Sequence, residues 1–389
     1  MNFDLSEDQK MLVDTARSFA AKESPPGRLR RLRDTDLGFE PKVWRQMGEL
    51  GWLGIPVPES LGGFGGRFID AALVIEQLGT TLVPEPYIPS IILAGMTLLE
   101  AGSAEQHKRW IPGLVAGEQT MALAWAERGS RYDVSRVDTR AARDGGSWRL
   151  DGEKLFVLGG HAADQLVVSA RTSGNAGEAA GVGLFVIDRN APGATVTPVA
   201  TMDGHKAAMV RLDGVTCGDD ARLGDEGGAV AHLQAAMDRG AAAACAEATG
   251  IAKRVLDMTV EYMKTREQFG TKIGSFQALQ HRAVDMFVQV ETCRSMMILA
   301  GLEIDCGDVE RRASAVSAAK VQLSTGGRYV TAQGVQLHGG IGCTDEHDVG
   351  LYFKRMQCLA MMFGDEEYHV ARYGALPGFA GGLDAGSLA

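Results

Sequence analysis

Three side chains with binding chemistry lie close together between Tyr262 and His281. The guanidinium group of Arg266 is a planar fork of donors that matches the oxygens of a phosphate or pyrophosphate group. Phe269 offers the face of an aromatic ring, and the amide of Gln277 can hydrogen-bond to neutral polar edges. Together these residues predict a binding site for a large phosphate-bearing ligand.

A second candidate segment contains Gln336 and the adjacent glycines Gly339 and Gly340. Glycines without a Cβ atom permit a ligand to approach the backbone closely. Purely structural explanations stay open for both segments: Phe269 can be a core aromatic residue, Gln277 a helix cap, and the glycine pair a turn. The two segments in one chain favour binding over these explanations.

One acidic side chain stands alone in an alanine-rich stretch. Glu247 is the only acidic or basic residue between Arg239 and Lys253. A buried carboxylate is costly unless it has a function or a partner, and in a dry site it can act as a general base. Glu247 is therefore a candidate base; alternatively it is exposed, or pairs with Arg254 or with an arginine of a partner chain.

The two binding segments resemble the flavin-binding signature of the acyl-CoA dehydrogenases. In that family an arginine and an aromatic residue leave the end of one long helix, a glutamine opens the next, and a Gln-x-x-Gly-Gly segment follows. The resemblance implies that FAD is the cofactor and that its dinucleotide end is bound across a dimer interface. The residues that it assigns to FAD are Arg266, Phe269, Gln277, Gln336, Gly339 and Gly340.

Two further segments, at 125–133 and 152–160, resemble the family's middle-domain segments on which the isoalloxazine ring rests. Here Ala126 and Leu158 stand where the family has threonines, and Phe156 replaces a tryptophan. The resemblance implies that the Ala126 backbone and the Phe156 ring still contact the flavin. The hydroxyl that meets the N5 region in the family is missing.

The usual catalytic carboxylate of the family is also missing. Its two usual positions are occupied by Met362 and Gly240. Glu247 lies seven residues beyond Gly240, on nearly the same helix face and roughly 10 Å along the axis. Acyl-CoA dehydrogenases of the steroid-degrading and pimeloyl-CoA dehydrogenase small-subunit types show the same Ala-Glu-x-x-Gly pattern, and in the steroid group this glutamate is the base. The resemblance therefore assigns Glu247 that role.

Other candidates remain for the base and for the substrate. The fallback acids are Asp365, Glu366 and Glu367, with Asp238 behind them. Tyr132 stands at the family's pantetheine-contacting position, so the resemblance assigns it to CoA.

The elements that must position these residues are predicted from hydrophobic periodicity and turn residues. Helical patterns fill residues 1–120, short strands with hairpin-type turns fill 121–224, and helical patterns return over 225–373, ahead of a Gly-, Ala- and Ser-rich tail at 374–389. This predicts an α+β protein with an N-terminal helical domain, a middle antiparallel β-barrel or sandwich, a C-terminal four-helix bundle and a flexible tail. The bundle helices are expected near 227–265, 275–305, 309–340 and 346–372.

Composition excludes several classes of function. The formal charge of −10 over 389 residues argues against nucleic-acid and anionic-membrane surfaces. The N-terminus has acids and no apolar core, and no window approaches a membrane span, so a cytoplasmic protein is expected. The six cysteines and eight histidines show no metal-ligand spacing, so no metal is expected.

The sequence thus predicts an FAD-dependent acyl-CoA dehydrogenase of lipid β-oxidation, which passes electrons to an electron-transferring flavoprotein. A homo- or hetero-tetramer, built as a dimer of dimers, is implied by resemblance. The acyl group is left open among straight-chain, dicarboxylic and steroid side-chain thioesters. Three alternatives are a non-catalytic partner subunit, an acyl-CoA oxidase, and a thioester-binding module without redox chemistry.

Overall fold

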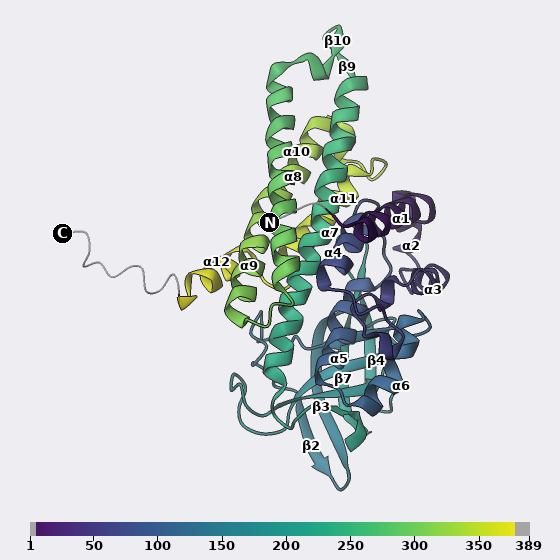
Figure 1. Ribbon diagram of the computed structural model, residues 1–389, viewed down its shortest axis with the longest axis vertical. Coiled ribbons are helices and arrows are strands. Elements are labelled where there is room, and N and C mark those ends of the chain that lie inside the picture. The colour runs from purple at the N-terminus through teal and green to yellow at the C-terminus, as the bar shows by residue number, and fades with distance from the viewer. Residues whose placement is uncertain (1–4, 378–389) are drawn as a thin grey trace, which may run out of the picture. The chain divides into compact units, whose positions relative to one another are not determined.

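The computed structural model describes residues 5–377, which fall into two compact units. Unit 1 is drawn from Met1–Arg28, Phe68–Val83 and Ala241–Ala389, and unit 2 from Leu29–Arg67 and Pro84–Gly240. Figure 1 shows that unit 1 is helical and that unit 2 carries the main sheet.

The sheet of unit 2 has eight strands in the order β6-β7-β3-β2-β4-β5-β8, with β1 paired to β4. Most neighbours are antiparallel, but β1 lies parallel to β4, and β2 meets β4 through one parallel pair. The expected β-rich middle region is therefore confirmed, while the sheet is mixed and not purely antiparallel. The strands are β1 (Met121–Ala124), β2 (Arg140–Asp144), β3 (Ser147–Leu158), β4 (Gln165–Arg171), β5 (Val182–Asp188), β6 (Ala194–Ala200), β7 (Lys206–Gly218) and β8 (Arg222–Leu223).

The core of this sheet comes from alternating inward side chains. On β3, Trp148 and Leu150 are buried while Arg149 between them is exposed, as the period of two in a strand requires. Trp148 packs on Phe185 of β5 with ring centroids 5.2 Å apart. Unit 2 also contains the helices α3 (Pro41–Glu49), α5 (Met96–Ala101) and α6 (Ala104–Val115); α2 (Pro26–Leu32) crosses the boundary between the units.

In unit 1, α1 (Glu7–Glu23) has Ser6 as its N-cap. The Ser6 hydroxyl accepts a hydrogen bond from the Gln9 backbone, and the Gln9 side chain accepts one from the Ser6 backbone, which is a capping box. The Gln9 amide also donates to Asp70 of α4 (Phe68–Gly79) at 2.9 Å. This bond and the packing of the two helices dock α1 on α4.

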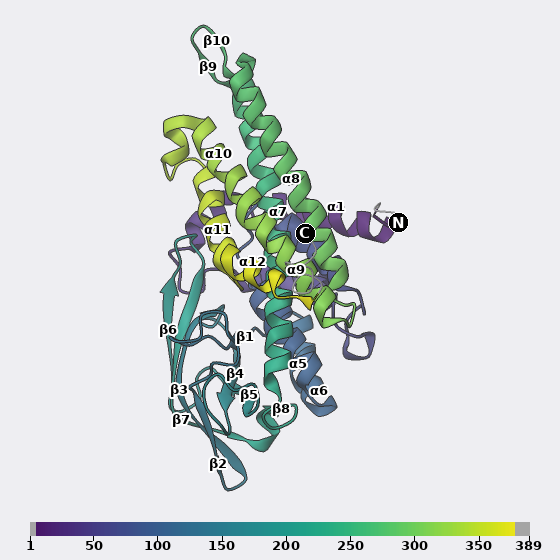
Figure 2. The same ribbon diagram turned by 90° about the vertical axis from the view of Figure 1, so that its left-hand side faces the viewer.

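The two longest helices form the axis of the C-terminal region. α7 (Ala229–Thr265) and α8 (Gln277–Glu303) run side by side and are joined at their tip by the short strands β9 (Glu267–Gln268) and β10 (Thr271–Lys272), as Figures 1 and 2 show. Both helices match the predicted ranges closely. The boundary between the units falls within α7, at Gly240.

The two remaining predicted bundle helices are each interrupted. The segment predicted at 309–340 is α9 (Val309–Gln322), a π-helical turn (Leu323–Gly327) and α10 (Arg328–His338). The segment predicted at 346–372 is α11 (Val349–Met361) and α12 (Glu366–Gly374). Phe363 and Gly364 have positive φ between α11 and α12, which a continuous helix cannot contain.

The predictions about membrane spans and metal sites can be compared with the described residues. Within residues 5–377, no helix is long and apolar enough to cross a membrane, and no group of three or more metal-ligating side chains is found. Of the tail predicted at 374–389, residues 378–389 lie outside the part that the structure describes.

Candidate functional site

Ala126 and Phe156 are neighbours in unit 2, joined by a bulge in β3. Lys154 pairs with Val210 of β7 and Val157 with Ala208, so two residues of β3 face one of β7. Phe156 within this bulge has φ of 47° and is 64% exposed. Leu155 turns its backbone N–H to the Ala126 carbonyl at 2.8 Å. The bulge therefore displays an aromatic face beside the 125–127 backbone.

A buried ion pair holds this backbone in place. The Lys154 ammonium, fully buried, donates to Glu127 at 2.6 Å and to the Ser169 hydroxyl at 2.9 Å. The Glu127 carboxylate also accepts the backbone N–H groups of Asp138 and Thr139. One carboxylate thus ties together both ends of the loop that contains Tyr132.

Burial and the attraction between the two charges act in opposite directions on the pKa of each partner. It lowers the pKa of Lys154 to about 8, although the Glu127 carboxylate opposes it. Burial raises the pKa of Glu127, but the Lys154 ammonium and the hydrogen-bond donors outweigh it and leave that pKa below its usual value. The pair is therefore ionised at neutral pH.

Tyr132 lies on the same loop, partly exposed, with the Arg131 guanidinium 6.0 Å from its ring centroid. The loop starts with a tight turn, in which the Glu127 N–H donates to the Ser130 hydroxyl at 2.9 Å. Ala126, Phe156 and Tyr132 thus belong to two connected segments of one unit. The segments 125–133 and 152–160 were identified separately in the sequence, and the structure places them together.

In unit 1, the predicted dinucleotide residues lie at the α7–α8 tip. Arg266 is exposed and its side chain makes no hydrogen bond or ion pair with any described residue. Phe269 is 92% exposed with φ of 56°, and its ring meets Phe276 edge-on at 6.2 Å. Gln277 is exposed at the first position of α8. Phe269 is therefore not a core residue in this chain.

The second dinucleotide segment lies at the end of α10. Gln336 is exposed in its last turn, and Gly339 ends the helix with φ of 65° and ψ of −145°, a conformation that essentially only glycine adopts. The His338 ring stacks on Tyr262 of α7 at 4.6 Å. Because Tyr262 lies one turn before Arg266, this contact brings the two predicted segments to the same end of the unit.

Glu247 is buried and paired. Its side chain leaves α7 among buried alanines, the residue is 7% exposed, and both carboxylate oxygens accept from Arg355 of α11. The Arg355 Nε lies 2.6 Å from Oε1, and an Nη lies 2.8 Å from Oε2. Arg254, the partner considered from the sequence, is exposed.

The fallback acids have other positions. Asp365 caps α12, where its carboxylate accepts the Tyr368 N–H at 2.9 Å. Glu366 is partly exposed and Glu367 is exposed, both in the first turn of α12. Asp238 is buried in the part of α7 that belongs to unit 2. Glu247 is the one of these acids that lies buried within unit 1.

Two buried side chains hold the segment that contains Met362. By the resemblance, this is the position of the usual base of the family. The Lys320 ammonium donates to the carbonyl oxygens of Leu359 and Met362 at 2.7 and 2.9 Å. A ring nitrogen of His369 lies 3.1 Å from the Phe363 carbonyl oxygen. These contacts tether the turn that contains Met362 to α9 and α12.

Three of these residues were missed in the sequence: Arg355, Lys154 and Lys320. Each is a basic residue on an otherwise apolar face of its helix or strand, which was a usable signal. Arg355 follows the buried Tyr352 by three residues, and Lys154 alternates with exposed Glu153. Their partners could not be read from the sequence, because each lies at least 15 residues away.

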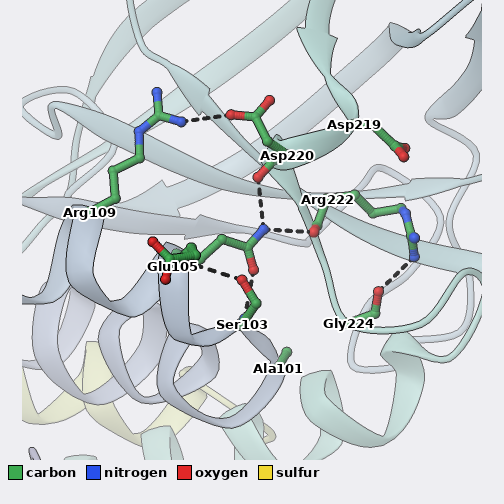
Figure 3. Close-up of a pocket in the computed structure, with 10 residues that line it drawn as sticks. Ala101, Ser103, Glu105, Arg109, Asp219, Asp220, Arg222 and Gly224 are labelled. Atoms are coloured by element: carbon green, nitrogen blue, oxygen red, sulfur yellow. Dashed lines mark hydrogen bonds and ion pairs between the residues drawn. The ribbon is translucent and has the colours of Figure 1, made fainter.

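Unit 2 also has a surface cleft of about 480 Å³ away from these residues. Figure 3 shows it between the start of α6 and the segment 219–224, with Arg109 bonded to Asp220. The Gln106 side-chain amide donates to the backbone carbonyl oxygens of Asp220 and Arg222, each at 2.8 Å. None of the predicted site residues lines it. The cleft is therefore separate from the candidate site.

The residues present fit an FAD molecule in chemical type. An unpaired exposed guanidinium, exposed aromatic faces and a glycine that leaves open space where a Cβ would stand are the groups that a pyrophosphate, a flavin ring and a close backbone approach require. Exposed Phe156 and Phe269 have no evident structural reason to be displayed at positive φ.

Comparison with known proteins agrees with this assignment. Family models for the N-terminal, middle and C-terminal domains of acyl-CoA dehydrogenases match residues 6–118, 122–215 and 226–375. The acyl-CoA dehydrogenase IpdE2 of Mycobacterium tuberculosis is 34% identical over 350 residues, covering 90% of this chain and 91% of the relative.

Two solved structures are similar over almost their whole length. The Tcur3481-Tcur3483 steroid ACAD has 30% identity and a TM-score of 0.86, covering 96% of this chain and 99% of that one. A chain from the electron-transferring flavoprotein study of Acidaminococcus fermentans has 28% identity and a TM-score of 0.89, covering 96% and 98%. The chain therefore belongs to the acyl-CoA dehydrogenase family, whose members are FAD-dependent oxidoreductases acting on CH–CH bonds.

Proposed function

We propose that this chain introduces an α,β double bond into an acyl-CoA thioester, with Glu247 as the catalytic base. The observation that supports this best is the carboxylate of Glu247, buried among alanines of α7 and held by an arginine at both of its oxygens. A buried carboxylate without a task would be replaced at little cost by an apolar residue.

The reaction divides between the chain and its cofactor. Glu247 takes the α-proton as the Cα–H bond breaks, and the electron pair of that bond forms the Cα=Cβ double bond. When bound, FAD would supply the acceptor for the β-hydrogen, which leaves Cβ as a hydride with the electron pair of its bond. Phe156 offers a ring face to the flavin, the Ala126 backbone meets its polar edge, and the Lys154–Glu127 pair keeps these two segments in register.

The dinucleotide end of FAD is assigned to the exposed tip of unit 1. Arg266 takes the pyrophosphate, Phe269 and Gln277 contact the cofactor beside it, and Gln336, Gly339 and Gly340 supply the second wall. We propose that these residues serve the flavin of a second subunit, in a homo- or hetero-tetramer built as a dimer of dimers. Their full exposure in a single chain supports this arrangement.

Tyr132 is proposed to contact the pantetheine of CoA, and an electron-transferring flavoprotein is proposed as the electron acceptor. The similarity to a chain studied with the electron-transferring flavoprotein of Acidaminococcus fermentans supports this acceptor. The similarity to a steroid ACAD makes steroid side-chain thioesters one of the substrate classes to test, alongside straight-chain and dicarboxylic thioesters.

The test is an anaerobic titration of the purified chain with a panel of these three acyl-CoA classes. Wild type and Glu247→Gln are followed side by side in the visible flavin band. We expect one class to bleach the wild type and none to bleach the variant, although both hold FAD. Bleaching of Glu247→Gln at the wild-type rate would overturn the assignment of the base.

A non-catalytic partner subunit is the second candidate function. Ala126 and Leu158, which replace the family's threonines, favour it because they weaken the chain's own flavin site. In that case the chain lends its unit 1 tip to another chain's flavin. A colourless chain that binds FAD only together with a paralogous chain would support this candidate over the first. Oxygen consumption without an added acceptor would instead indicate an oxidase.

A further inference from the structure

Glu247 and Arg355 are locked together at the meeting of three helices. Both residues are buried, with exposed fractions of 7% and 8%. The guanidinium contacts both carboxylate oxygens, at 2.6 and 2.8 Å, which fixes the plane of the carboxylate as well as its position. A single-point contact would leave that plane free to rotate.

Arg355 is itself held rigidly, because α11 is anchored on either side of it. One turn earlier, the Tyr352 hydroxyl donates to the Thr80 carbonyl oxygen at the end of α4, at 2.7 Å. One turn later, Lys320 of α9 bonds to the carbonyl oxygens of Leu359 and Ala360. These contacts hold α11 in place, so the Arg355 guanidinium cannot move together with the Glu247 carboxylate.

The third side of the arrangement is the contact between α4 and α7. Gly79, which precedes Thr80, lies against the backbone of Glu247, where an added Cβ would come within 2.3 Å of the Glu247 carbonyl oxygen. The same turn of α4 thus contacts the backbone of Glu247 and, through Thr80, the helix of Arg355. This geometry fixes both ends of the ion pair against the same turn of α4.

The fixed pair is compatible with proton abstraction. Each carboxylate oxygen has two lone pairs, so one on each oxygen remains after both have accepted from the guanidinium. When the carboxyl takes a proton it becomes neutral, and the charge-assisted bonds to Arg355 weaken. The arginine thus contacts both carboxylate oxygens and leaves on each a lone pair that can take the proton.

We propose that Arg355 is a positioning residue for Glu247, which holds its carboxylate in one orientation for removal of the α-proton. This inference rests on the proposed function, since it needs Glu247 to be the base. It adds a residue of α11 that acts only through Glu247 and touches neither substrate nor flavin.

The test compares Arg355→Gln, Arg355→Lys and Glu247→Gln, each loaded with FAD and normalised to bound flavin. The probe is the acyl-CoA that bleaches the wild type, unlabelled and with deuterium at the α- or the β-carbon. For Arg355→Gln we expect a bleaching rate on the order of 10²-fold lower, at an unchanged apparent Kd for the acyl-CoA. We also expect a larger α-deuterium isotope effect and no increase in the β-deuterium effect, because only proton removal becomes harder.

Arg355→Lys keeps the charge but loses the planar fork, so its rate should lie between those of the wild type and Arg355→Gln. If Arg355→Gln does not fold, the bleaching rate and isotope effects of Arg355→Lys test the inference in its place. The matched control is Arg294→Gln, which breaks the pair of Arg294 with buried Glu76 in the same unit. This control should lower the melting temperature and leave both isotope effects unchanged.

The outcomes separate the inference from the proposed function. If no acyl-CoA bleaches the wild type, or if Glu247→Gln bleaches normally, the proposed function fails and the inference fails with it. If Glu247→Gln is inactive while folded Arg355→Gln or Arg355→Lys reacts at the wild-type rate with unchanged isotope effects, the inference alone is overturned.

Discussion

Gly79 on α4 and Glu247 on α7 are in direct backbone contact, and this contact sets the depth of Glu247 in unit 1. An added Cβ on Gly79 would lie 2.3 Å from the Glu247 carbonyl oxygen. One turn further along α7, a Cβ on Gly250 would lie 1.9 Å from the carbonyl oxygen of Glu76 on α4. Each helix thus contributes a glycine where the other's backbone passes, so the two approach more closely than side chains would allow.

We therefore expect Gly250→Ala to push α4 and α7 apart, because no flexible side chain can give way to the new methyl group. The free energy of unfolding should fall by roughly 3 kcal/mol or more, and acyl-CoA-dependent bleaching should be lost with the displaced Glu247. Urea denaturation and the anaerobic titration measure the two effects. Gly350→Ala on α11 is the control, since its Cβ would meet only ordinary contacts at 3.6 and 3.7 Å; equal losses in both variants would contradict the prediction.

The sequence predicts most of the fold because its signals are local. The apolar periodicity of 227–265 and 275–305 locates α7 and α8 to within a few residues, and Ser6 marks the start of α1. The interruptions were not predicted. The π-helical turn at Leu323–Gly327 depends on packing: a Cβ on Gly327 would meet the Met356 sulfur of α11 at 2.8 Å. Only the folded chain contains that contact.

The candidate site likewise contains residues that the sequence predicts and residues that it does not. Types of residue and their spacing identify Arg266, Phe269 and the glycine pair, because each sits in a short local motif. The partner of Glu247 is 108 residues away in the sequence, and no local pattern links the two. The bulge at Phe156 was also missed, since it arises from pairing between β3 and β7. Contacts between residues far apart in the chain thus cannot be predicted from a single sequence.

The Phe156 side chain should lower the stability of the FAD-free chain and strengthen its binding of FAD. A side chain at φ of 47° costs roughly 1–2 kcal/mol, and 64% of this residue is exposed, so packing offsets little of that cost. Phe156→Gly and Phe156→Ala both lose the ring and should retain FAD less tightly. Only glycine removes the strain, so Phe156→Gly should be about 1 kcal/mol more stable than Phe156→Ala in the FAD-free state.

Flavin retention on gel filtration and denaturation of the FAD-free proteins separate these two effects. If the alanine and glycine variants are equally stable, the positive φ of Phe156 carries no cost. If both retain FAD like the wild type, the ring does not contact the flavin.

Arg171 should be the main support of the loops beyond the flavin segments. Its guanidinium is buried and donates to five backbone carbonyl oxygens, those of Ser135, Val137, Ser173, Glu178 and Ala180. Arg171→Met leaves these acceptors without a donor, so we expect a loss of about 3 kcal/mol in the free energy of unfolding. Hydrogen exchange should accelerate at 133–138 and 173–181.

The matched control is Arg140→Met. Arg140 is exposed and donates to the carbonyl oxygen of Gly174 at 2.9 Å, so its loss should change stability by no more than about 0.5 kcal/mol. Equal exchange in the two variants would show that Arg171 does not organise these loops.

Lys320 should make stability depend on pH in the alkaline range. Burial lowers the pKa of its ammonium from 10.5 to about 8, and its acceptors are backbone carbonyl oxygens. Below pH 8 the side chain is charged in both the folded and the unfolded chain. Between pH 8 and 10.5 the unfolded chain binds more protons at this site than the folded chain, so the contribution of Lys320 to stability rises with pH, by up to about 3 kcal/mol.

Cysteines with raised pKa values act in the opposite direction over this range, so the measured quantity is a difference between two proteins. We expect the free energy of unfolding of the wild type, relative to Lys320→Met, to rise from pH 8 to pH 10.5 in urea titrations. Lys264→Met on the exposed face of α7 is the control and should give a flat difference. A flat difference for Lys320→Met as well would mean that the buried ammonium stays protonated throughout, held by the carbonyl oxygens at the end of α11.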